Sequence, residues 1–428
     1  MKILIKNSTL ISMSENREQI EENIDILIDG NRISKVDYNL NDENIDKVID
    51  ATGKIVMPGL INTHSHIPMS IFRETVDGLC MQDWLEKKIW PMEDKLTDED
   101  VYYASMLSYL EMIETGCTTI NDMYYMTENS IKAAVNTGVR LQTTRTLTEL
   151  EENVDGSKRI IELKELLKKY RNKNDNITFN VGIHGLYTAN RNYIKECVNI
   201  AKEEKLPIQM HFCENSKEVE DIEKIYNEKP VQILEKEFQN IKLLLAHCVK
   251  LSDEEINRMA KIGNISIAHC PVSNLKLGCG VANISEMMKQ GINVALGTDG
   301  QGSGCNLDMF EEMKYAVLLQ KGIKEEAKLL PAYEVLKMAT INGAKALNLE
   351  DEIGTIEVGK KADLIVIDLS NVITNPINNI FAELVYNVKG YNVETTIING
   401  NILMDDRKLL IDKKEIIDKC KEIIDRIK

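Results

Sequence analysis

Histidine is the residue type that points most directly to chemistry in this sequence. Each histidine stands at the end, or just past the end, of a short apolar run with the composition of a β-strand. Catalytic groups of barrel enzymes collect at the carboxyl ends of the strands. One histidine in such a place is usually an ordinary core residue, but six of six indicate a functional site. The 428-residue chain has only these six: His64, His66, His184, His211, His247 and His269.

Two of the histidines have the spacing of a chelating pair. Residues two apart on a strand point to the same face, so the run Thr63-His64-Ser65-His66 aims two imidazoles at one point. His211 ends a second strand-like run, and Asp299 ends the last one. Three nitrogens and one oxygen suit Zn²⁺, with Fe²⁺ as the alternative. We therefore expect a divalent metal ion held by His64, His66, His211 and Asp299.

Eight strand-like runs in the middle of the chain would position these side chains. They alternate with longer amphipathic stretches, such as 98–115 and 157–170, that predict helices. This alternation is the pattern of an α/β fold with a (β/α)8 TIM-like barrel. A doubly wound sheet is the alternative, but no G-x-G-x-x-G follows the first strand to support it. The runs cover residues 57–63, 118–123, 139–144, 177–183, 207–212, 242–247, 264–269 and 293–297.

The two ends of the chain have a different texture from the middle. Short β-branched runs separated by turns occur near the start and return over 363–368 and 393–398. We expect both ends to form one discontinuous β-sandwich domain, with residues 1–57 as its first part and 355–428 as its second. The metal-dependent barrel then covers residues 58–354. Helical spacing near the end predicts a final helix in the second part.

Charge and cysteine usage exclude several kinds of partner. The chain has 52 basic and 68 acidic residues, so its net charge of −16 repels nucleic acid. No stretch reaches the roughly 18 apolar residues of a membrane span, and the start lacks the apolar core of a signal peptide. Nine cysteines without a C-x-x-C pair are typical of buried thiols in a reducing compartment. We expect a cytoplasmic homo-oligomer without nucleic-acid or membrane partners.

Two segments resemble the amidohydrolase superfamily. Residues 58–66 (PGLINTHSH) look like its signature, and 354–364 (GTIEVGKKADL) look like its return into the β-sandwich, so the resemblance spans essentially the whole chain. Binuclear members have a bridging lysine or carboxylate at the fourth strand. Here that strand ends in Ile183-His184-Gly185, so the resemblance implies one metal ion per chain.

Within that superfamily the chain is similar to the 5-methylthioadenosine/S-adenosylhomocysteine deaminases. This similarity implies a hydrolase that converts the 6-amino group of an adenosine-type nucleoside to the inosine-type product and ammonia. 5-Methylthioadenosine, S-adenosylhomocysteine, adenosine and 5′-deoxyadenosine differ only beyond the 5′ carbon, so these residues do not rank them. The matching segments are 90–93 (WPME), Arg145, 184–188 (HGLYT), 211–214 (HFCE) and 269–274 (HCPVSN).

The resemblance also implies three catalytic roles. Glu214 would contact the purine, protonate N1 and later protonate the leaving amine. Asp299, as a metal ligand beside the attacking water, would contact the substrate and act as the base. His247 would orient that water.

Three further residues would recognise the substrate. Glu93 would accept hydrogen bonds from both ribose hydroxyls, although a solvated helix residue is the alternative at this position. His184 would contact the adenine or the ribose. Arg145 would lie beyond the 5′ carbon, where it suits the carboxylate of a homocysteine group.

Four residues near these motifs have open roles. Trp84 either forms an apolar wall of the pocket or packs in the core. His269 either shapes the pocket or holds the turn at Pro271. Ser303 would support Asp299 by a hydrogen bond, and no role follows for Arg159.

Other functions of the same fold are the main alternatives. A guanine or other free-base deaminase would not need Glu93. Triazine-type hydrolases tend to lack the acidic residue that stands here as Glu214. A non-catalytic scaffold protein would have lost metal ligands that this chain keeps.

Overall fold

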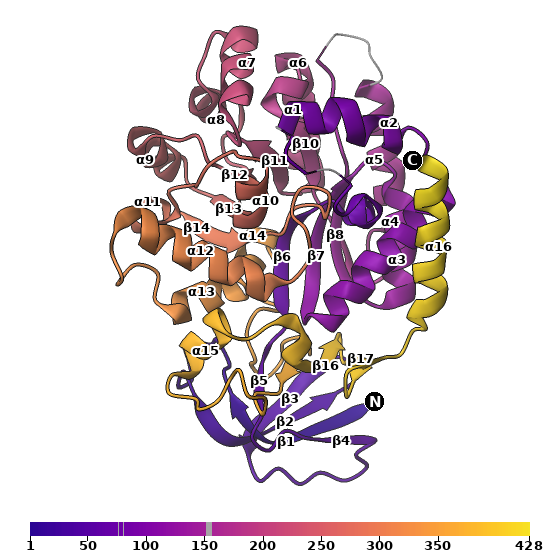
Figure 1. Cartoon of the computed structure of the whole chain (residues 1–428), viewed down its shortest axis with the longest axis vertical. Helices are drawn as coiled ribbons and strands as arrows, with labels where there is room; N and C mark the ends of the chain where they lie inside the picture. Colours follow the sequence, from indigo (N-terminus) through magenta and orange to yellow (C-terminus); the bar gives the residue numbers. More distant parts are fainter. Residues whose placement is uncertain (76, 80, 151–155) are drawn as a thin grey trace.

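The computed structural model of the chain describes residues 1–75, 77–79, 81–150 and 156–428. Figure 1 shows a parallel α/β body above a β-rich layer built from both ends of the chain. This arrangement confirms the predicted fold class.

The body contains the predicted strands in the predicted order. Two parallel ladders, β6–β9 and β10–β14, form the barrel wall. The fourth predicted strand is divided at Asn180, whose amide donates to Thr143 on one side, while the amide of Val181 donates to Pro207 on the other. The strands are β6 (Leu60–Ser65), β7 (Cys117–Tyr124), β8 (Arg140–Arg145), β9 (Ile177–Phe179), β10 (Val181–Gly185), β11 (Ile208–Phe212), β12 (Leu243–His247), β13 (Ile265–His269) and β14 (Asn293–Leu296).

Hydrogen bonds between the first and last strands close the barrel. The Thr63 hydroxyl donates to the carbonyl of Leu296 at 2.7 Å. The amide of Asp299 donates to the carbonyl of His64 at 3.0 Å. Barrel closure therefore places two predicted metal ligands, distant in sequence, on adjoining backbone.

Helices surround the barrel, and both stretches predicted to be helical are helices. Local capping sets some of their starts: Thr97 and Asp100 form a capping box on α3. The barrel helices are α3 (Asp98–Glu114), α4 (Thr127–Thr137), α5 (Gly156–Tyr170), α6 (Arg191–Glu204), α7 (Ser216–Tyr226), α8 (Pro230–Glu237), α9 (Asp253–Ile262), α10 (Pro271–Lys276), α11 (Ile284–Lys289), α12 (Met309–Lys324), α13 (Ala332–Met338) and α14 (Ile341–Leu347).

Short helical segments cover the carboxyl ends of the strands. A 3₁₀ segment follows β6, and a nearly continuous helical stretch, with a π-helical turn in its middle, lies between it and α3 (Figure 1). These segments are η1 (Ile67–Phe72), α1 (Met81–Trp84), η2 (Leu85–Ile89), α2 (Trp90–Glu93) and, after β10, η3 (Leu186–Thr188).

The β-rich layer joins the two chain ends in one nine-stranded sheet with its own apolar core. Strand β5 is the junction, because it pairs in parallel with β1 and antiparallel with β15. The segments are β1 (Lys2–Leu10), β2 (Glu21–Asp29), β3 (Arg32–Tyr38), β4 (Lys47–Asp50), β5 (Ile55–Pro58), β15 (Leu364–Ile367), α15 (Ile380–Tyr386), η4 (Gly390–Asn392), β16 (Val393–Ile398), β17 (Asn401–Asp405) and β18 (Lys408–Leu409).

A buried ion pair links this sheet to the barrel. The guanidinium of Arg140, the first residue of β8, donates to both carboxylate oxygens of Asp363 at 2.6 and 2.9 Å. The side chains are only 4% and 2% exposed. Asp363 also accepts from the amide of Asn399 at 2.7 Å.

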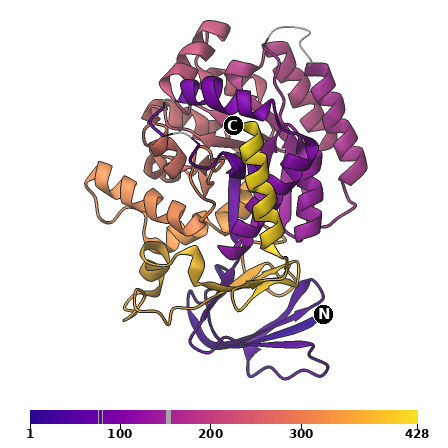
Figure 2. The ribbon, with the colours of Figure 1, turned by 45° about the vertical axis from the view of Figure 1, so that its right-hand side comes forward.

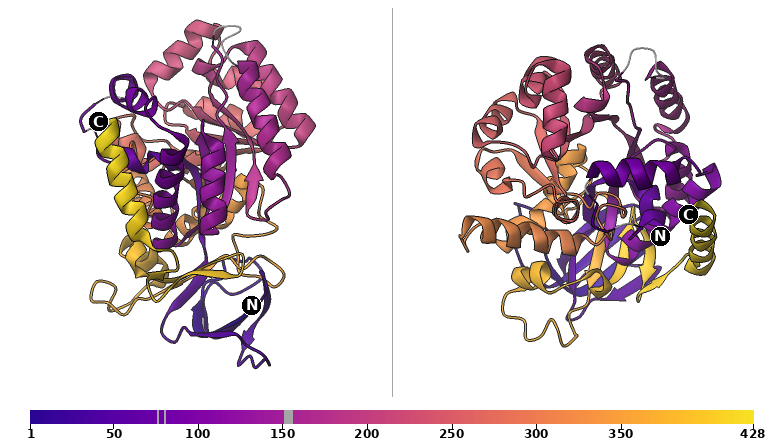
Figure 3. Two further views of the ribbon diagram at one scale, coloured as in Figure 1. Left: turned by 90° about the vertical axis from the view of Figure 1, so that its right-hand side faces the viewer. Right: turned by 45° about the horizontal axis from the view of Figure 1, so that its top comes forward.

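The last helix, α16 (Lys413–Ile427), leaves the sheet and packs beside α3 of the barrel, as Figures 2 and 3 show. Arg426 forms an ion pair with Asp100, and Lys95 donates to the carbonyl of Ile427 at 2.7 Å. The helix expected with the β-rich part of the chain thus lies against the barrel. Among the described residues, no helix is long and apolar enough to span a lipid bilayer.

Candidate active site

The four predicted metal ligands converge at the carboxyl end of the barrel. His66 Nε2 lies 3.2 Å from Nε2 of His211 and 3.2 Å from Oδ1 of Asp299. His64 Nε2 lies 3.6 Å from the same oxygen. Zinc–nitrogen bonds of about 2.0–2.1 Å in a tetrahedron separate ligand atoms by about 3.3 Å. The separations in this group therefore fit a single small divalent cation.

Hydrogen bonds fix the imidazoles in the form that binds a metal. Nδ1 of His66 donates to the carbonyl of Met123 at 2.7 Å, and Nδ1 of His211 donates to the carbonyl of His184 at 2.6 Å. Each bond leaves the Nε2 lone pair free to coordinate. Nε2 of His64 is buried and has no hydrogen-bond partner among the described residues; a cation at this point would satisfy it.

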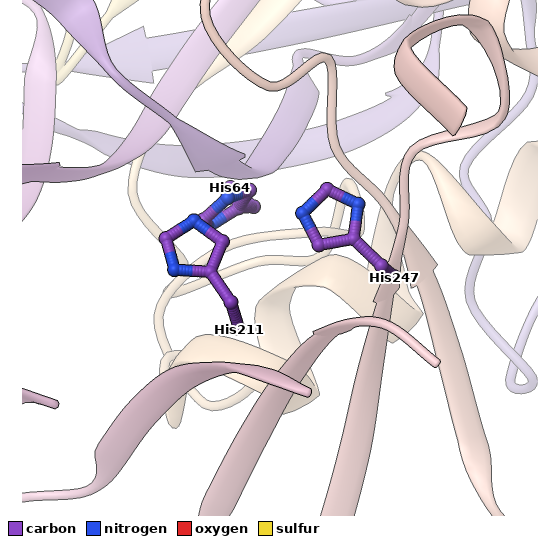
Figure 4. Close-up of side chains that lie close together, drawn as sticks. All are labelled: His64, His211 and His247. Carbon is purple, nitrogen blue, oxygen red and sulfur yellow. The ribbon is translucent and has the colours of Figure 1, made fainter. Parts of the chain in front are cut away.

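His247 joins the same group from β12. The ring nitrogens of His64, His211 and His247 lie within 4.8 Å of one another, and their rings approach one another from separate strands (Figure 4). Nδ1 of His247 lies 2.8 Å from Oδ1 of Asn274, so Nε2 points into the site. That nitrogen is 3.9 Å from Oε2 of Glu214. His247 therefore lies between the ligand group and Glu214.

The carboxylate of Asp299 is held by hydroxyl and amide donors. Oδ2 accepts from Ser273 at 2.6 Å and from Ser303 at 2.7 Å. Oδ1 accepts from the amide of Gly300 at 2.8 Å and faces the histidines. One oxygen is thus anchored while the other is available to a cation.

Charge in this group is balanced by opposite pKa shifts. Burial lowers the pKa of His66, but the hydrogen bond to Asp299, the negative charges of Asp299 and Asp122 and the hydrogen bond to the Met123 carbonyl together outweigh burial and raise that pKa to about 9. Burial raises the pKa of Asp299, yet the same bond and the nearby imidazoles hold it well below its usual range. Asp299 is therefore ionised, and its negative charge favours a positive charge beside it, as a bound divalent cation would provide.

A cavity of about 730 Å³ opens above these ligands. His64 and His269 are buried and are not among the residues that line the cavity. Both ring nitrogens of His269 lack a protein partner among the described residues, and burial lowers its pKa to about 3. Other residues singled out in the sequence line the cavity: His66, Trp84, Glu93, Arg145, Arg159, His184, His211, Glu214, His247, Asp299 and Ser303.

Glu214 is a buried carboxyl group at the turn between β11 and α7. Burial raises its pKa. Its amide and that of Cys213 donate to the two carboxylate oxygens of Glu218 at 2.6 and 2.9 Å, so Glu218 braces the turn. Cys279 Sγ lies 3.7 Å from Oε1 of Glu214.

Glu93 ends α2 and enters the cavity wall from the segment above the barrel. The Tyr124 hydroxyl donates to its Oε1 at 2.7 Å. Burial raises the pKa of Glu93 to about 7, although this hydrogen bond opposes the shift.

Arg145, Arg159 and His184 also line the cavity, and the His184 ring lies 4.9 Å from that of His211. Arg145 Nε donates to Glu162 at 2.7 Å, and Arg159 donates to the carbonyl of Thr148. His184 Nδ1 lies 3.1 Å from the Thr188 hydroxyl, and burial lowers the pKa of His184 to about 4. The imidazole of His184 is therefore neutral at physiological pH.

A family model, the Amidohydrolase family, matches residues 55–403 of the chain. The chain belongs to this family. A 5-methylthioadenosine/S-adenosylhomocysteine deaminase of Caldanaerobacter subterraneus subsp. tengcongensis is 41% identical to this amidohydrolase over 411 residues, 96% of this chain and 94% of the relative. A 5′-deoxyadenosine deaminase of Methanosarcina barkeri is 39% identical over 409 residues, 95% and 94% of the two chains.

A solved structure is similar over the full length of this amidohydrolase. The adenosine deaminase from Xanthomonas campestris with bound zinc superposes with a TM-score of 0.94 at 28% identity, covering 99% of this chain and 98% of the other. The similarity includes both the barrel and the β-rich layer.

Backbone strain in this amidohydrolase concentrates at the site. Cys213, His247 and Asp299 have φ angles of 50°, 72° and 61°, in the left-handed region that residues other than glycine rarely adopt. Such strain persists where the surrounding structure over-determines it, and it is typical of functional sites. Here it turns three strand ends toward the ligand group.

Sequence reasoning missed several supporting residues of this amidohydrolase. Ser273 and Asn274 lie four and five residues after His269, inside the 269–274 motif, but the motif was given without a role for either residue. Glu218 could have been suspected as a carboxylate four residues after Glu214. Tyr124 gave no signal, because its partner lies 31 residues earlier.

Proposed function

We propose that this amidohydrolase is a metal-dependent deaminase of adenosine-type nucleosides. The substrates would be 5-methylthioadenosine, S-adenosylhomocysteine, 5′-deoxyadenosine or adenosine, each converted to the inosine-type product and ammonia. One observation carries the proposal: a single cavity joins a histidine–aspartate ligand group, the buried carboxyl group of Glu214 beside it and a second carboxylate, Glu93, in its wall. The names of the relatives and of the zinc-bound structure support the same activity.

The proposed cofactor is one divalent metal ion per chain, Zn²⁺ with Fe²⁺ as the alternative. His64, His66, His211 and Asp299 would hold it, at the separations given above. When bound, the ion would lower the pKa of a water molecule to about 7 and so supply a nucleophile at neutral pH.

Side chains of the protein would then transfer the protons. Glu214 in its acid form donates a proton to N1 of the purine, where negative charge develops as water attacks C6. Asp299 accepts a proton from the attacking water, and His247 Nε2 orients that water, fixed by the bond to Asn274. Glu214, now ionised, takes the second proton from the hydroxyl on C6 and gives it to the departing amine. The proton held by Asp299 then returns Glu214 to its acid form, so the cycle closes with one proton added to N1 and one to ammonia.

Substrate recognition would use the walls of the cavity. Glu93 accepts hydrogen bonds from the ribose hydroxyls, and His184 contacts the base or the ribose. Arg145 lies beyond the 5′ carbon, where its remaining donors meet the 5′ substituent. A cavity of about 730 Å³ lies within the range of small-molecule sites, roughly 300–1,000 Å³.

Trp84, His269 and Ser303 would act as supports in this proposal. Trp84 is buried and packs in the apolar core, and it also lines the cavity. Ser303 anchors Asp299 from the cavity side. His269 backs the wall from the core without reaching the cavity.

Features of the site also weigh against the other functions of this fold. A guanine or other free-base deaminase leaves the half-buried Glu93 without a purpose. A scaffold protein does not need a complete ligand set with fixed imidazole tautomers.

The setting of the enzyme belongs to the same proposal. Eight cysteines of the described residues are free thiols, which supports a reducing, cytoplasmic compartment. The acidic charge supports a small-molecule rather than a nucleic-acid partner. Exposed Val372 and Ile373 offer an apolar contact between copies in a homo-oligomer.

The variant Glu214→Gln tests the proposed chemistry. It keeps the shape of the side chain but cannot carry a proton. We expect it to bind the same amount of metal as the wild type and to lose at least about 100-fold in kcat for ammonia release. Normal turnover by the metal-loaded variant would refute the proton-transfer role of Glu214.

A further inference from the structure

Two adjacent tyrosines fasten the segment above the cavity to the barrel. Tyr124 is the last residue of β7 and Tyr125 follows it, with their rings stacked at a centroid separation of 4.5 Å. The Tyr124 hydroxyl donates to Oε1 of the Glu93 carboxylate at 2.7 Å, whereas the Tyr125 hydroxyl reaches only the Glu93 carbonyl at 3.4 Å. The two tyrosines thus contact different parts of Glu93: Tyr124 contacts its carboxylate and Tyr125 its backbone carbonyl.

The Tyr124 contact lies in a dry and rigid part of the wall. Tyr124 is 4% exposed, and burial holds its pKa well above the usual value, so the hydroxyl remains a donor. It comes from a barrel strand, while Glu93 comes from α2 in the segment above (Figure 1). The hydrogen bond therefore fixes the Glu93 carboxylate relative to strand β7 of the barrel.

An ionised carboxylate has about four acceptor positions on its two oxygens. Within the part of the chain that the structure describes, Tyr124 is the hydrogen-bond donor to this carboxylate, and the other acceptor positions remain for a ligand. The terminal torsion of a glutamate is broad and has no strong rotational preference. Without Tyr124, the carboxylate would lose its fixed orientation, and a ligand would have to order it on binding.

We propose that Tyr124 is a positioning residue for ribose recognition: it orients Glu93 so that the free acceptor positions face the vicinal 2′,3′-diol of the substrate. The inference rests on the proposed function, because it requires a ribonucleoside in the cavity. It adds a residue that determines selectivity for the sugar and does not take part in the chemistry at C6.

The charged groups that act on Glu93 are His66 and Asp94. Neither is altered by a change of Tyr124 to phenylalanine, which removes one oxygen and keeps the ring in place. Tyr124→Phe therefore removes the donor to the carboxylate. Tyr125→Phe is the matched control, since it removes the neighbouring hydroxyl, which contacts the Tyr124 hydroxyl and the Glu93 carbonyl but does not donate to the carboxylate.

The experiment measures kcat and KM of the wild type, Tyr124→Phe and Tyr125→Phe for an adenosine-type ribonucleoside and for its 2′-deoxy analogue. We expect Tyr124→Phe to raise KM for the ribonucleoside about tenfold, to change kcat less than about twofold, and to lower the preference for ribose over 2′-deoxyribose. Tyr125→Phe should leave that preference unchanged.

A double-variant comparison separates positioning from a general structural effect. If Tyr124 acts through Glu93, adding Tyr124→Phe to Glu93→Gln should not raise KM further. An additive loss, or an equal rise in KM for the ribose and 2′-deoxyribose substrates, would overturn the proposal. A wild-type enzyme that does not deaminate nucleosides would overturn the proposed function and this inference together, whereas normal wild-type turnover with unchanged selectivity in Tyr124→Phe overturns this inference alone.

Discussion

The two serines that hold Asp299 provide a quantitative test of the metal site. Ser273 and Ser303 are buried, and their hydroxyls are 2.6 and 2.7 Å from the same oxygen, Oδ2. A hydrogen bond to a charged group contributes roughly 1.5–3 kcal/mol. Replacing either serine by alanine leaves Oδ2 with one donor among the described residues, and replacing both leaves it with none. The Gly300 amide on Oδ1 is then the remaining donor, so the carboxylate is held less firmly for coordination.

The expected effect is on metal affinity. Because about 1.4 kcal/mol corresponds to a factor of ten, each alanine variant should bind Zn²⁺ roughly 10- to 100-fold more weakly. The double variant should lose more than either single one. The measurement is competition for Zn²⁺ between the metal-free protein and a chromophoric chelator. Ser266→Ala, on β13 and bonded to Asn293, is the control. A double variant with a Zn²⁺ dissociation constant within about twofold of this control would refute the reasoning.

Three further predictions follow from other parts of the structure. Arg140→Met should lower the free energy of unfolding by about 3–5 kcal/mol in urea titrations, because it leaves the buried carboxylate of Asp363 uncompensated. Arg171→Met, at an exposed ion pair, should cost less than about 1 kcal/mol, and equal losses in the two variants would contradict a stabilising role of the Arg140–Asp363 pair. Because burial raises the pKa of Glu93 to about 7, the carboxylate that accepts the ribose hydrogen bonds forms as the pH rises through 7. KM for a nucleoside should therefore fall over that interval in the wild type and stay constant in Glu93→Gln. A wild-type KM that does not change with pH would count against the ribose contact. Glu218→Gln removes one of the two oxygens that accept from the amides of Cys213 and Glu214, and it should lower kcat about tenfold with unchanged metal content. Glu220→Gln, at an exposed position, should match the wild type in a steady-state assay. Identical kinetics of the two variants would exclude a role of Glu218 in holding the Glu214 turn.

Much of the fold was predictable because its signals are local. The barrel strands are short apolar runs that alternate with amphipathic stretches, and this periodicity is visible in the sequence. Asn180 shows the limit of such signals: it divides one predicted strand through bonds to residues on both neighbouring strands. The position of α16 shows the same limit, since an amphipathic helix has an apolar face but does not specify which surface it covers.

The site was predictable where strand geometry and family resemblance act together. The H-x-H pair, His211 and Asp299 end strands of one barrel, so closure of the barrel brings them to one point. The contacts of Tyr124 with Glu93 and of Ser273 with Asp299 join residues 31 and 26 positions apart. Only the packing of separate elements creates such pairs, so neither spacing nor residue type predicted them.

The most direct test of the account is a comparison of substrates on the purified, metal-loaded enzyme. The measurement is kcat/KM for ammonia release from 5-methylthioadenosine and from free adenine. The account predicts one ammonia per nucleoside consumed and a preference for the nucleoside of about 100-fold or more, since hydrogen bonds from two ribose hydroxyls to a carboxylate contribute roughly 1.5–3 kcal/mol each. Equal rates for the free base and the nucleoside, or consumption of the nucleoside without ammonia, would contradict it.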